Sequence, residues 1–175
     1  KSYAKERIQG KKISELRDPK SNSVSIVNHP AVRHNLFNMK AKVEAMRALL
    51  YYTAFQFDIE KTAKTNERKI RAQNMVDLLT PMCKGWCTEV GLDVVQTGIQ
   101  ILGGVGYTKD FPLEQLFRDA RIAPIYEGTT DIQALDLLGR KMIKHDGILF
   151  KQSMEQFSEL IEEHKGNQIL KDLFK

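Results

Sequence analysis

Apolar residues recur every three or four positions along a stretch that begins near Pro30, and this spacing predicts a long amphipathic helix. Proline suits the first turn of a helix, so we expect the helix to begin at Pro30 and to run to about Ala63. One apolar stripe, with a period of about 3.5 residues, consists of Val32, Leu36, Met39, Val43, Met46, Leu50 and Phe57. A helix of this length needs other helices packed along its stripe.

A second long helix is predicted after Thr65 and Asn66. Its apolar face consists of Leu79, Cys83, Trp86, Val90, Thr97 and Ile101. Pro81 lies inside this pattern and Gly85 follows it, yet the stripe keeps its phase across the proline. We therefore expect a kink after Leu79 and not the end of the helix.

Shorter helical patterns lie nearer the ends of the chain. Residues 1–8 are typical of the end of a helix, and a polar loop follows over about 11–28. Another helix is expected over about 130–145, with Thr130 and Gln133 forming a capping box. Its inward side chains are predicted to be Ile132, Leu135, Leu138 and Met142.

After a break at Asp146–Gly147, the rest of the chain has a further amphipathic pattern. Its apolar members are Met154, Phe157, Leu160, Ile161, Leu173 and Phe174. The alternation of β-branched residues that is typical of strands is missing throughout. The patterns predict an all-α fold: an antiparallel up-and-down four-helix bundle over residues 1–146, with 147–175 beginning an additional helical extension.

Composition narrows the class of protein. The chain has 42% hydrophobic and 28% charged residues, as ordinary globular domains do. The 27 basic and 22 acidic residues are spread along the chain, so nucleic-acid binding is a minor alternative. No apolar run approaches the ~20 residues that a membrane span needs. The unusual first residue, Lys1, and the position of Lys175 inside a helical pattern indicate a fragment.

Cys83 and Cys87 stand one helical turn apart. Parallel positions on one helix face suit a disulfide poorly, and no nearby cysteine or histidine completes a zinc site. We therefore expect reduced thiols, no bound metal and a cytoplasmic location.

The residues with candidate chemistry lie between Gln100 and Gln133. Three glycines, Gly103, Gly104 and Gly106, suit a tight turn or a ligand pressed against the main chain. Further on, Glu127 lies where a loop meets a helix, a place where catalytic side chains are often held. Taken singly, such glycines are more often a plain helix cap, and such a glutamate is more often a solvated loop residue.

Taken together, these residues resemble the C-terminal signature of the acyl-CoA dehydrogenases. The shared residues are Gln100, Gly103, Gly104, Gly106, Tyr107, Asp110, Pro112, Glu114, Arg118–Ala120 and Tyr126–Thr129. Near the start of the chain, Arg7 and Gln9 match an Arg-x-Gln pair of the same family, although the phenylalanine that usually follows is absent. The tail beyond about Lys144 resembles that of the larger bacterial members.

The resemblance implies α,β-dehydrogenation of an acyl-CoA thioester, with FAD as the hydride acceptor. It implies that Glu127 removes the α-proton, that the Glu127 N–H and a flavin hydroxyl hold the enolate oxygen, and that Tyr126 and Gly128 contact the substrate. The residues that it places at the FAD, partly across a subunit boundary, are Arg7, Gln9, Gln100, Ile101, Leu102, Gly103, Gly104, Thr129 and Asp131.

The same resemblance implies a homo-oligomer, either a dimer or a dimer of dimers, and an electron-transfer flavoprotein as the electron acceptor. Large side chains that lie off the first stripe, at Phe37, Tyr51 and Tyr52, favour an oligomer because they need a cover. Two alternatives stay open. One is an acyl-CoA oxidase that passes its electrons to oxygen, and the other is a non-catalytic helical module that serves only assembly.

Overall fold

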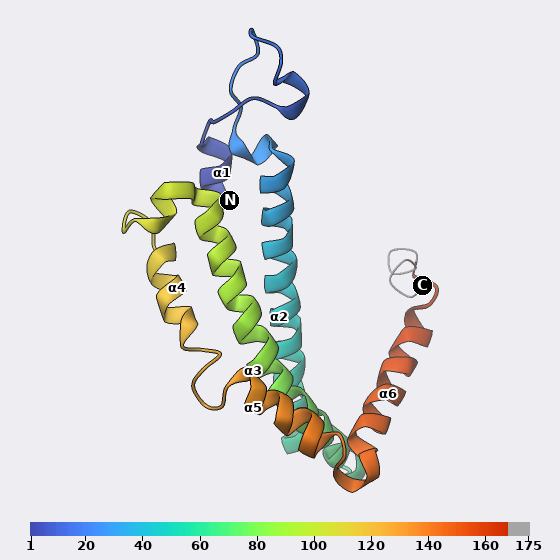
Figure 1. The fold of residues 1–175 in the computed structure, drawn as a ribbon. Helices are drawn as coiled ribbons and strands as arrows, with labels where there is room; N and C mark the ends of the chain where they lie inside the picture. Colours follow the sequence, from blue (N-terminus) through green and yellow to red (C-terminus); the bar gives the residue numbers. More distant parts are fainter. Residues whose placement is uncertain (168–175) are drawn as a thin grey trace. The chain divides into compact units, whose positions relative to one another are not determined.

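The computed structural model describes residues 1–167, apart from the side chains of residues 144 and 145, and these residues are mostly helical (Figure 1). The α-helices are α1 (Ser2–Glu6), α2 (Pro30–Thr62), α3 (Asn66–Leu102), α4 (Leu113–Arg121), α5 (Thr130–Leu135) and α6 (Lys144–His164). Short 3₁₀ helices cover Ile13–Glu15, Ile26–Asn28 and Gly103–Tyr107, and a π-helical segment covers Asp136–Lys141. Within residues 1–167 there is no strand, only an isolated antiparallel bridge between Ile8 and Ser25. The all-α prediction is confirmed.

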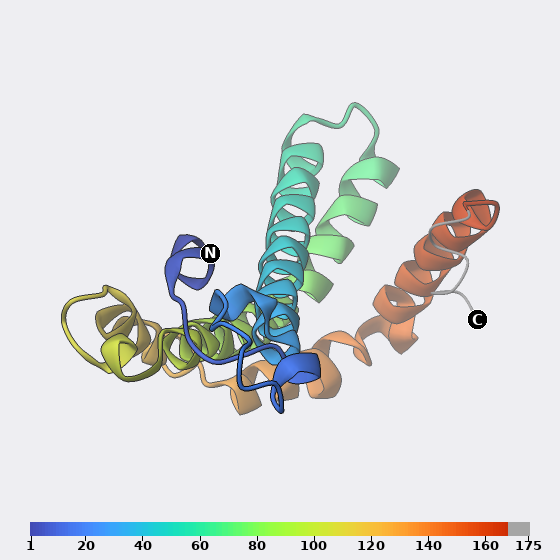
Figure 2. The ribbon, with the colours of Figure 1, turned by 90° about the horizontal axis from the view of Figure 1, so that it is seen from above.

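The chain divides into two compact units, each built from two separate stretches. The first unit contains Lys1–Ala48 and Trp86–Glu127, and the second contains Leu49–Gly85 and the chain from Gly128 onward. Both long helices, α2 and α3, therefore contribute one part to each unit. Figure 2 shows the later part of α2 and the early part of α3 as an antiparallel pair joined by a short turn.

In the first unit, three helices meet at Gly98. A Cβ atom on Gly98 would lie 3.0 Å from Leu113 Cδ1 of α4 and 3.5 Å from Met39 Cε of α2. The absent side chain therefore lets α2, α3 and α4 approach one another closely. Lys42 and Asp93 add an ion pair of 2.6 Å between α2 and α3. The sequence patterns predicted no helix at Leu113–Arg121, so α4 is a difference between prediction and structure.

The core of the second unit is a cluster on α3. Met75, Leu78 and Leu79 are buried there. Leu49 of α2 packs against this cluster, as do Leu137 of the π-helical segment and Met142 directly after that segment. Leu79 is buried as the second apolar stripe predicted, whereas Trp86 of the same stripe is exposed.

The apolar stripe predicted for α2 holds for its first part only. Val32, Leu36, Met39, Val43 and Met46 are half-buried. Leu50, however, is 46% exposed, and Phe57 is exposed as well. Leu49 and Thr53 face the core of the second unit in their place. An α-helix has about 3.6 residues per turn, so a stripe with a period of 3.5 rotates slowly away from the face that is packed.

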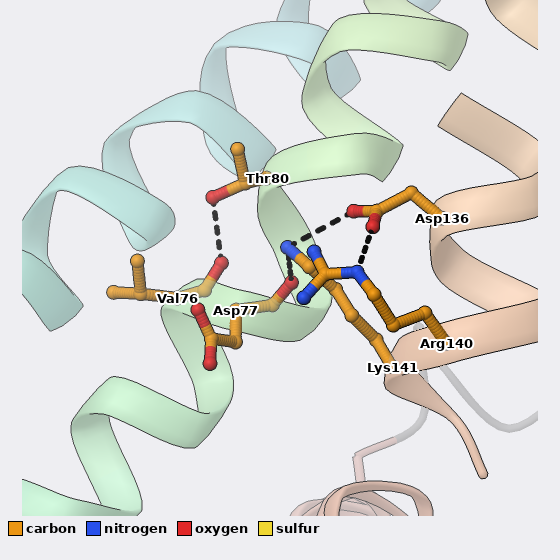
Figure 3. Close-up of polar contacts among 6 residues, drawn as sticks. All are labelled: Val76, Asp77, Thr80, Asp136, Arg140 and Lys141. Atoms are coloured by element: carbon orange, nitrogen blue, oxygen red, sulfur yellow. Dashed lines mark hydrogen bonds and ion pairs between the residues drawn. The ribbon is translucent and has the colours of Figure 1, made fainter. Parts of the chain in front are cut away.

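Pro81 lies inside α3 without ending it, as the phase of the stripe predicted. A proline has no N–H, so the carbonyl of Asp77, four residues earlier, lacks its helical partner. The Lys141 ammonium fills that place: its Nζ lies 2.5 Å from the Asp77 carbonyl oxygen, and Lys141 is only 8% exposed (Figure 3). Nearby, the Thr80 hydroxyl donates to the Val76 carbonyl at 2.7 Å.

Asp136 supplies the counter-charge for the buried Lys141 ammonium. One Asp136 oxygen lies 3.4 Å from Lys141 Nζ, and the other lies 2.5 Å from Arg140 Nε (Figure 3). The hydrogen bond from Arg140 lowers the pKa of Asp136 below its ordinary value, and the charge of Lys141 acts in the same direction, while desolvation opposes both. A buried cation with a carboxylate partner and a carbonyl partner is electrostatically satisfied.

The π-helical segment changes which side chains face the core. Its hydrogen bonds span five residues, as in the bond from Met142 N–H to the Leu137 carbonyl at 2.9 Å. Leu137 and Met142 therefore share a face, whereas in an α-helix residues five apart point about 140° from each other. The predicted inward set is wrong except for Met142, because Leu138 is 60% exposed and Ile132 and Leu135 are exposed as well.

The last described helix, α6, is fixed to the second unit by polar and small side chains. Asn74 Nδ2 donates to Gln152 Oε1 at 2.7 Å, and Leu149 and Ser153 are buried. The apolar residues that predicted this helix are exposed, namely Met154, Phe157, Leu160 and Ile161. Leu173 and Phe174 lie outside the described residues. No helix within residues 1–167 is long and apolar enough to cross a membrane.

Candidate functional site

Glu127 lies in a turn whose backbone conformation favours glycine. Its φ is 54°, and the next residue, Gly128, has a φ of 92°. Within residues 1–167, the only other non-glycine residue with a positive φ is Asp146. A left-handed glutamate is uncommon, and strain of this kind collects at functional sites. Glu127 is also exposed.

Gly128 is required at its position for two reasons. A positive φ is one, and close packing is the other. A Cβ atom here would lie 2.9 Å from Gln133 Nε2 and 3.3 Å from Ile132 Cγ2. The carbonyl oxygen of Gly128 accepts a hydrogen bond from Lys84 Nζ at 3.0 Å. The backbone that follows Glu127 is therefore packed on the first turn of α5 and tied to α3, all within the second unit.

Thr129 caps α5 in place of the predicted Thr130. Its backbone is extended, and its hydroxyl accepts a hydrogen bond from the Ile132 N–H at 3.5 Å. A capping box needs glutamate or glutamine three residues after the cap, and Ile132 occupies that place. Thr130, which was predicted to be the cap, is instead the first residue of α5. Asp131 lies in the first turn of the helix and is exposed.

The three glycines after α3 differ in what requires them. Gly103 has a φ of 69° and follows the last residue of α3. Gly106 is buried, and a Cβ atom on it would lie 2.7 Å from the Ile99 carbonyl oxygen. Gly104 has neither constraint, because its φ is not positive and a Cβ atom on it would meet no described heavy atom within 4 Å. Its main chain is open to close approach by a ligand.

Arg7 and Gln9 belong to the same unit as the glycine cluster. The Tyr3 hydroxyl of α1 donates to the Leu102 carbonyl at 3.2 Å, and the Tyr3 ring meets the Phe111 ring edge-on at a centroid distance of 5.5 Å. These contacts hold the start of the chain at the end of α3. Arg7 and Gln9 are both exposed, with Arg7 Nη2 lying 3.5 Å from Gln9 Oε1.

The predicted site residues are divided between the two units. Those in the first unit are Arg7, Gln9, Gln100, Ile101, Leu102, Gly103, Gly104, Tyr126 and Glu127. Those in the second unit are Gly128, Thr129 and Asp131. Most of these residues are exposed, while Ile101, Leu102 and Gly128 are half-buried. The chain passes from one unit to the other at the peptide bond between Glu127 and Gly128.

Comparison with known families decides what kind of domain carries this turn. A family model described as "Acyl-CoA dehydrogenase, C-terminal domain" matches residues 4–143. The chain belongs to the acyl-CoA dehydrogenase family. The match covers both long helices, the glycine cluster and the Glu127 turn of this acyl-CoA dehydrogenase domain, and it ends just before α6.

Relatives of this acyl-CoA dehydrogenase domain are found in several bacteria. The chain is 40% identical over 165 residues to 3-methylmercaptopropionyl-CoA dehydrogenase of Ruegeria pomeroyi, covering 94% of this chain and 27% of that protein. It is 37% identical over 171 residues to the broad-specificity linear acyl-CoA dehydrogenase FadE5 of Mycobacterium tuberculosis, covering 97% and 28%. The chain thus spans about a quarter of the length of these relatives.

A solved structure shares the fold of this acyl-CoA dehydrogenase domain. Caenorhabditis elegans ACDH-11 in complex with C11-CoA matches with a TM-score of 0.78, over 95% of this chain and 25% of that one. The sequences are 23% identical, so this likeness concerns the fold. It confirms the predicted helical-bundle class.

Two residues with contacts at the site were not predicted from the sequence. Lys84 reaches a carbonyl 44 residues away in the chain, and its place in the α3 pattern does not set it apart from other lysines. Tyr3 is held by a carbonyl 99 residues away. Contacts over such separations depend on the tertiary fold, and a helical period cannot predict them.

Proposed function

We propose that the complete protein containing this domain oxidises an acyl-CoA thioester to the enoyl-CoA, with Glu127 as the base and FAD as the hydride acceptor. The observation that carries this proposal is the turn itself. In a chain of this family, Glu127 stands exposed in a left-handed backbone within the run Ile125–Thr129. The names of two relatives specify dehydrogenation of CoA thioesters, which supports the same class of substrate.

Glu127 suits the removal of an α-proton from a thioester. A carboxylate oxygen accepts the proton, and a bound thioester that excludes water makes the carboxylate a stronger base. The Glu127 N–H is the donor that we assign to the thioester oxygen, where negative charge develops as the proton leaves. Gly128 has no side chain to obstruct the substrate. When bound, the flavin accepts the β-hydride, which no protein side chain can accept.

The residues that we assign to FAD have suitable chemistry. Arg7 offers a guanidinium for phosphate oxygens, and the amides of Gln9 and Gln100 offer both donors and acceptors for hydroxyl groups. The open main chain at Gly104 allows a nucleotide to lie against it. Further residues assigned to the cofactor are Ile101, Leu102, Gly103, Thr129 and Asp131, and Tyr126 is assigned to the substrate.

The proposed reaction is tested on the complete protein purified with its flavin. Mixing with a series of saturated acyl-CoA thioesters without oxygen should bleach the absorbance of the oxidised flavin and yield enoyl-CoA. Turnover with an electron-transfer flavoprotein and little turnover with oxygen would support a dehydrogenase, whereas rapid formation of hydrogen peroxide would establish an oxidase. If no acyl-CoA bleaches the flavin, the proposal fails in favour of the assembly module.

We also propose that the complete protein is a homo-oligomer, a dimer or a dimer of dimers. On α2, the large side chains of Phe37, Tyr51, Tyr52 and Phe55 are all exposed. Exposed aromatic side chains in such number usually mark an interface. Sedimentation velocity at micromolar concentration should give a mass of two or four chains, and a monomer that retains FAD would contradict this assignment.

A further inference from the structure

Lys84 makes a contact that its position on a helix surface does not require. It is half-buried, and its Nζ lies 3.0 Å from the carbonyl oxygen of Gly128. A lysine ammonium is normally left in water, where it is well hydrated, and only its carbon stem is covered. A charged donor on a carbonyl oxygen forms a hydrogen bond stronger than that between neutral groups. The carbonyl that it holds belongs to the residue directly after Glu127.

The reach of Lys84 is set by the close approach of α3 to α5. The next residue on α3 is Gly85, which is buried. A Cβ atom on Gly85 would lie 3.8 Å from Gln133 Cβ and 3.9 Å from Thr130 Cγ2, both on α5. This packing brings α3 next to the first helical turn of α5. It leaves Lys84 beside Gly128, in the loop that precedes α5. The contact is therefore built on two packed helices of the second unit.

The backbone at Gly128 is packed against α5 and is held by hydrogen bonds on its C-terminal side. Its φ of 92° lies in a region that glycine adopts freely, so the residue imposes no preference of its own. The Thr129 cap fixes the chain on one side of Gly128, through its hydroxyl and the Ile132 N–H. Lys84 fixes the peptide plane between Gly128 and Thr129. Together they restrain the backbone directly after Glu127, whose own φ of 54° is unfavourable for glutamate.

We propose that Lys84 is a positioning residue for Glu127, holding the Gly128 carbonyl so that the base and its N–H keep their orientation toward the thioester; this inference rests on the proposed dehydrogenation. In this role Lys84 acts through the backbone that follows Glu127. A base displaced by about 1 Å can lose about 10²-fold in rate. Loss of the ammonium should therefore slow the proton-transfer step and leave the affinity for acyl-CoA nearly unchanged.

The test uses the complete flavin-loaded protein and two substitutions at one position. Lys84→Met keeps the length and apolar stem of the side chain but removes the donor, and Lys84→Arg keeps a cationic donor. At saturating acyl-CoA, Lys84→Met should slow flavin reduction by about 10²-fold, while Lys84→Arg should recover most of the loss. The half-saturating acyl-CoA concentration should stay within about twofold of wild type in both.

The matched control is Lys69→Met, which removes an exposed lysine from the same helix. It should reduce flavin at the wild-type rate. FAD content and melting temperature are measured for every variant, because a purely structural role would lower these and not the rate per bound flavin. The inference is overturned if Lys84→Met reduces flavin within about threefold of wild type, or if its rate loss merely follows its loss of FAD.

Glu127→Gln separates this inference from the proposed function. If Glu127→Gln blocks flavin reduction and Lys84→Met does not, the dehydrogenation stands and the role of Lys84 falls. If Glu127→Gln reduces flavin normally, the proposed function fails at its base. In that case any effect of Lys84→Met has a cause other than the positioning of Glu127. The inference about Lys84 then fails together with the proposed function.

Discussion

Replacing Glu127 by glutamine should slow the reduction of the flavin by acyl-CoA. The loss of rate should exceed the factor of about 10²–10⁴ that a general acid or base typically contributes. Glutamine has nearly the shape of glutamate but cannot accept a proton, and within Ile125–Thr129 no second carboxylate takes its place. The reaction would have to rely on water, which is a far weaker base than a desolvated carboxylate. Stopped-flow absorbance of the flavin, with acyl-CoA in excess and oxygen removed, measures the rate directly.

The substitution should leave binding largely intact. The charge lost at Glu127 does not lie among the residues assigned to FAD, so FAD content should stay near that of wild type. Glu159→Gln, which neutralises an exposed carboxylate on α6 outside the matched family range, is the control and should reduce flavin normally. A Glu127→Gln variant that reduces flavin at close to the wild-type rate would place the base elsewhere.

Replacing Lys141 by methionine should loosen the junction between α3 and the π-helical segment. The substitution removes the Lys141 donor from the Asp77 carbonyl, whose helical partner is absent because residue 81 is proline. An unsatisfied buried carbonyl costs about 1–3 kcal/mol. Amide hydrogen exchange of the complete protein should therefore speed up about 5–150-fold in peptides that cover 130–143, if these amides exchange by local opening.

A double-mutant cycle tests the cause of that loosening. Pro81→Ala gives residue 81 an N–H that can donate to the Asp77 carbonyl within the helix, so Lys141→Met should cost clearly less in the Pro81→Ala background. Arg140→Met is the control. It removes the other cation near Asp136, but this side chain is largely exposed, so the loss of stability should be small. Equal losses for Lys141→Met in both backgrounds would show that the proline is not the reason for the contact.

The ends of the long helices could be predicted because local signals mark them. Pro30 opens α2 as predicted, and α2 ends at Thr62, one residue before the expected end. The phase of the apolar stripe across Pro81 also predicted that α3 would continue. These features depend on residues a few positions apart, and local backbone chemistry decides them. The family motif likewise predicted a role for Glu127, because its residues are adjacent in the sequence.

The failures have physical causes that the sequence does not display. A fixed period placed Leu50 in the core, because a spacing of 3.5 residues drifts against a helix of about 3.6 residues per turn. Leu138 was predicted to face inward because an α-helical period was assumed. The sequence does not indicate the five-residue hydrogen bonds that place Leu137 on the same face as Met142. The short helix α4 spans too few turns to show a period, and the partner of Lys84 is 44 residues away.

The left-handed backbone of Glu127 sets the proposed role of this residue as the base against the stability of its turn. Glycine would adopt a φ of 54° without the about 1–3 kcal/mol that such a conformation costs other residues. Glu127→Gly is therefore a substitution that stabilises the turn while it deletes the proposed base. A lineage in which a carboxylate from another helix took over the proton would meet no conformational obstacle at this turn. On the proposed function, the requirement for a base, and not folding, favours glutamate at a position that folding would give to glycine.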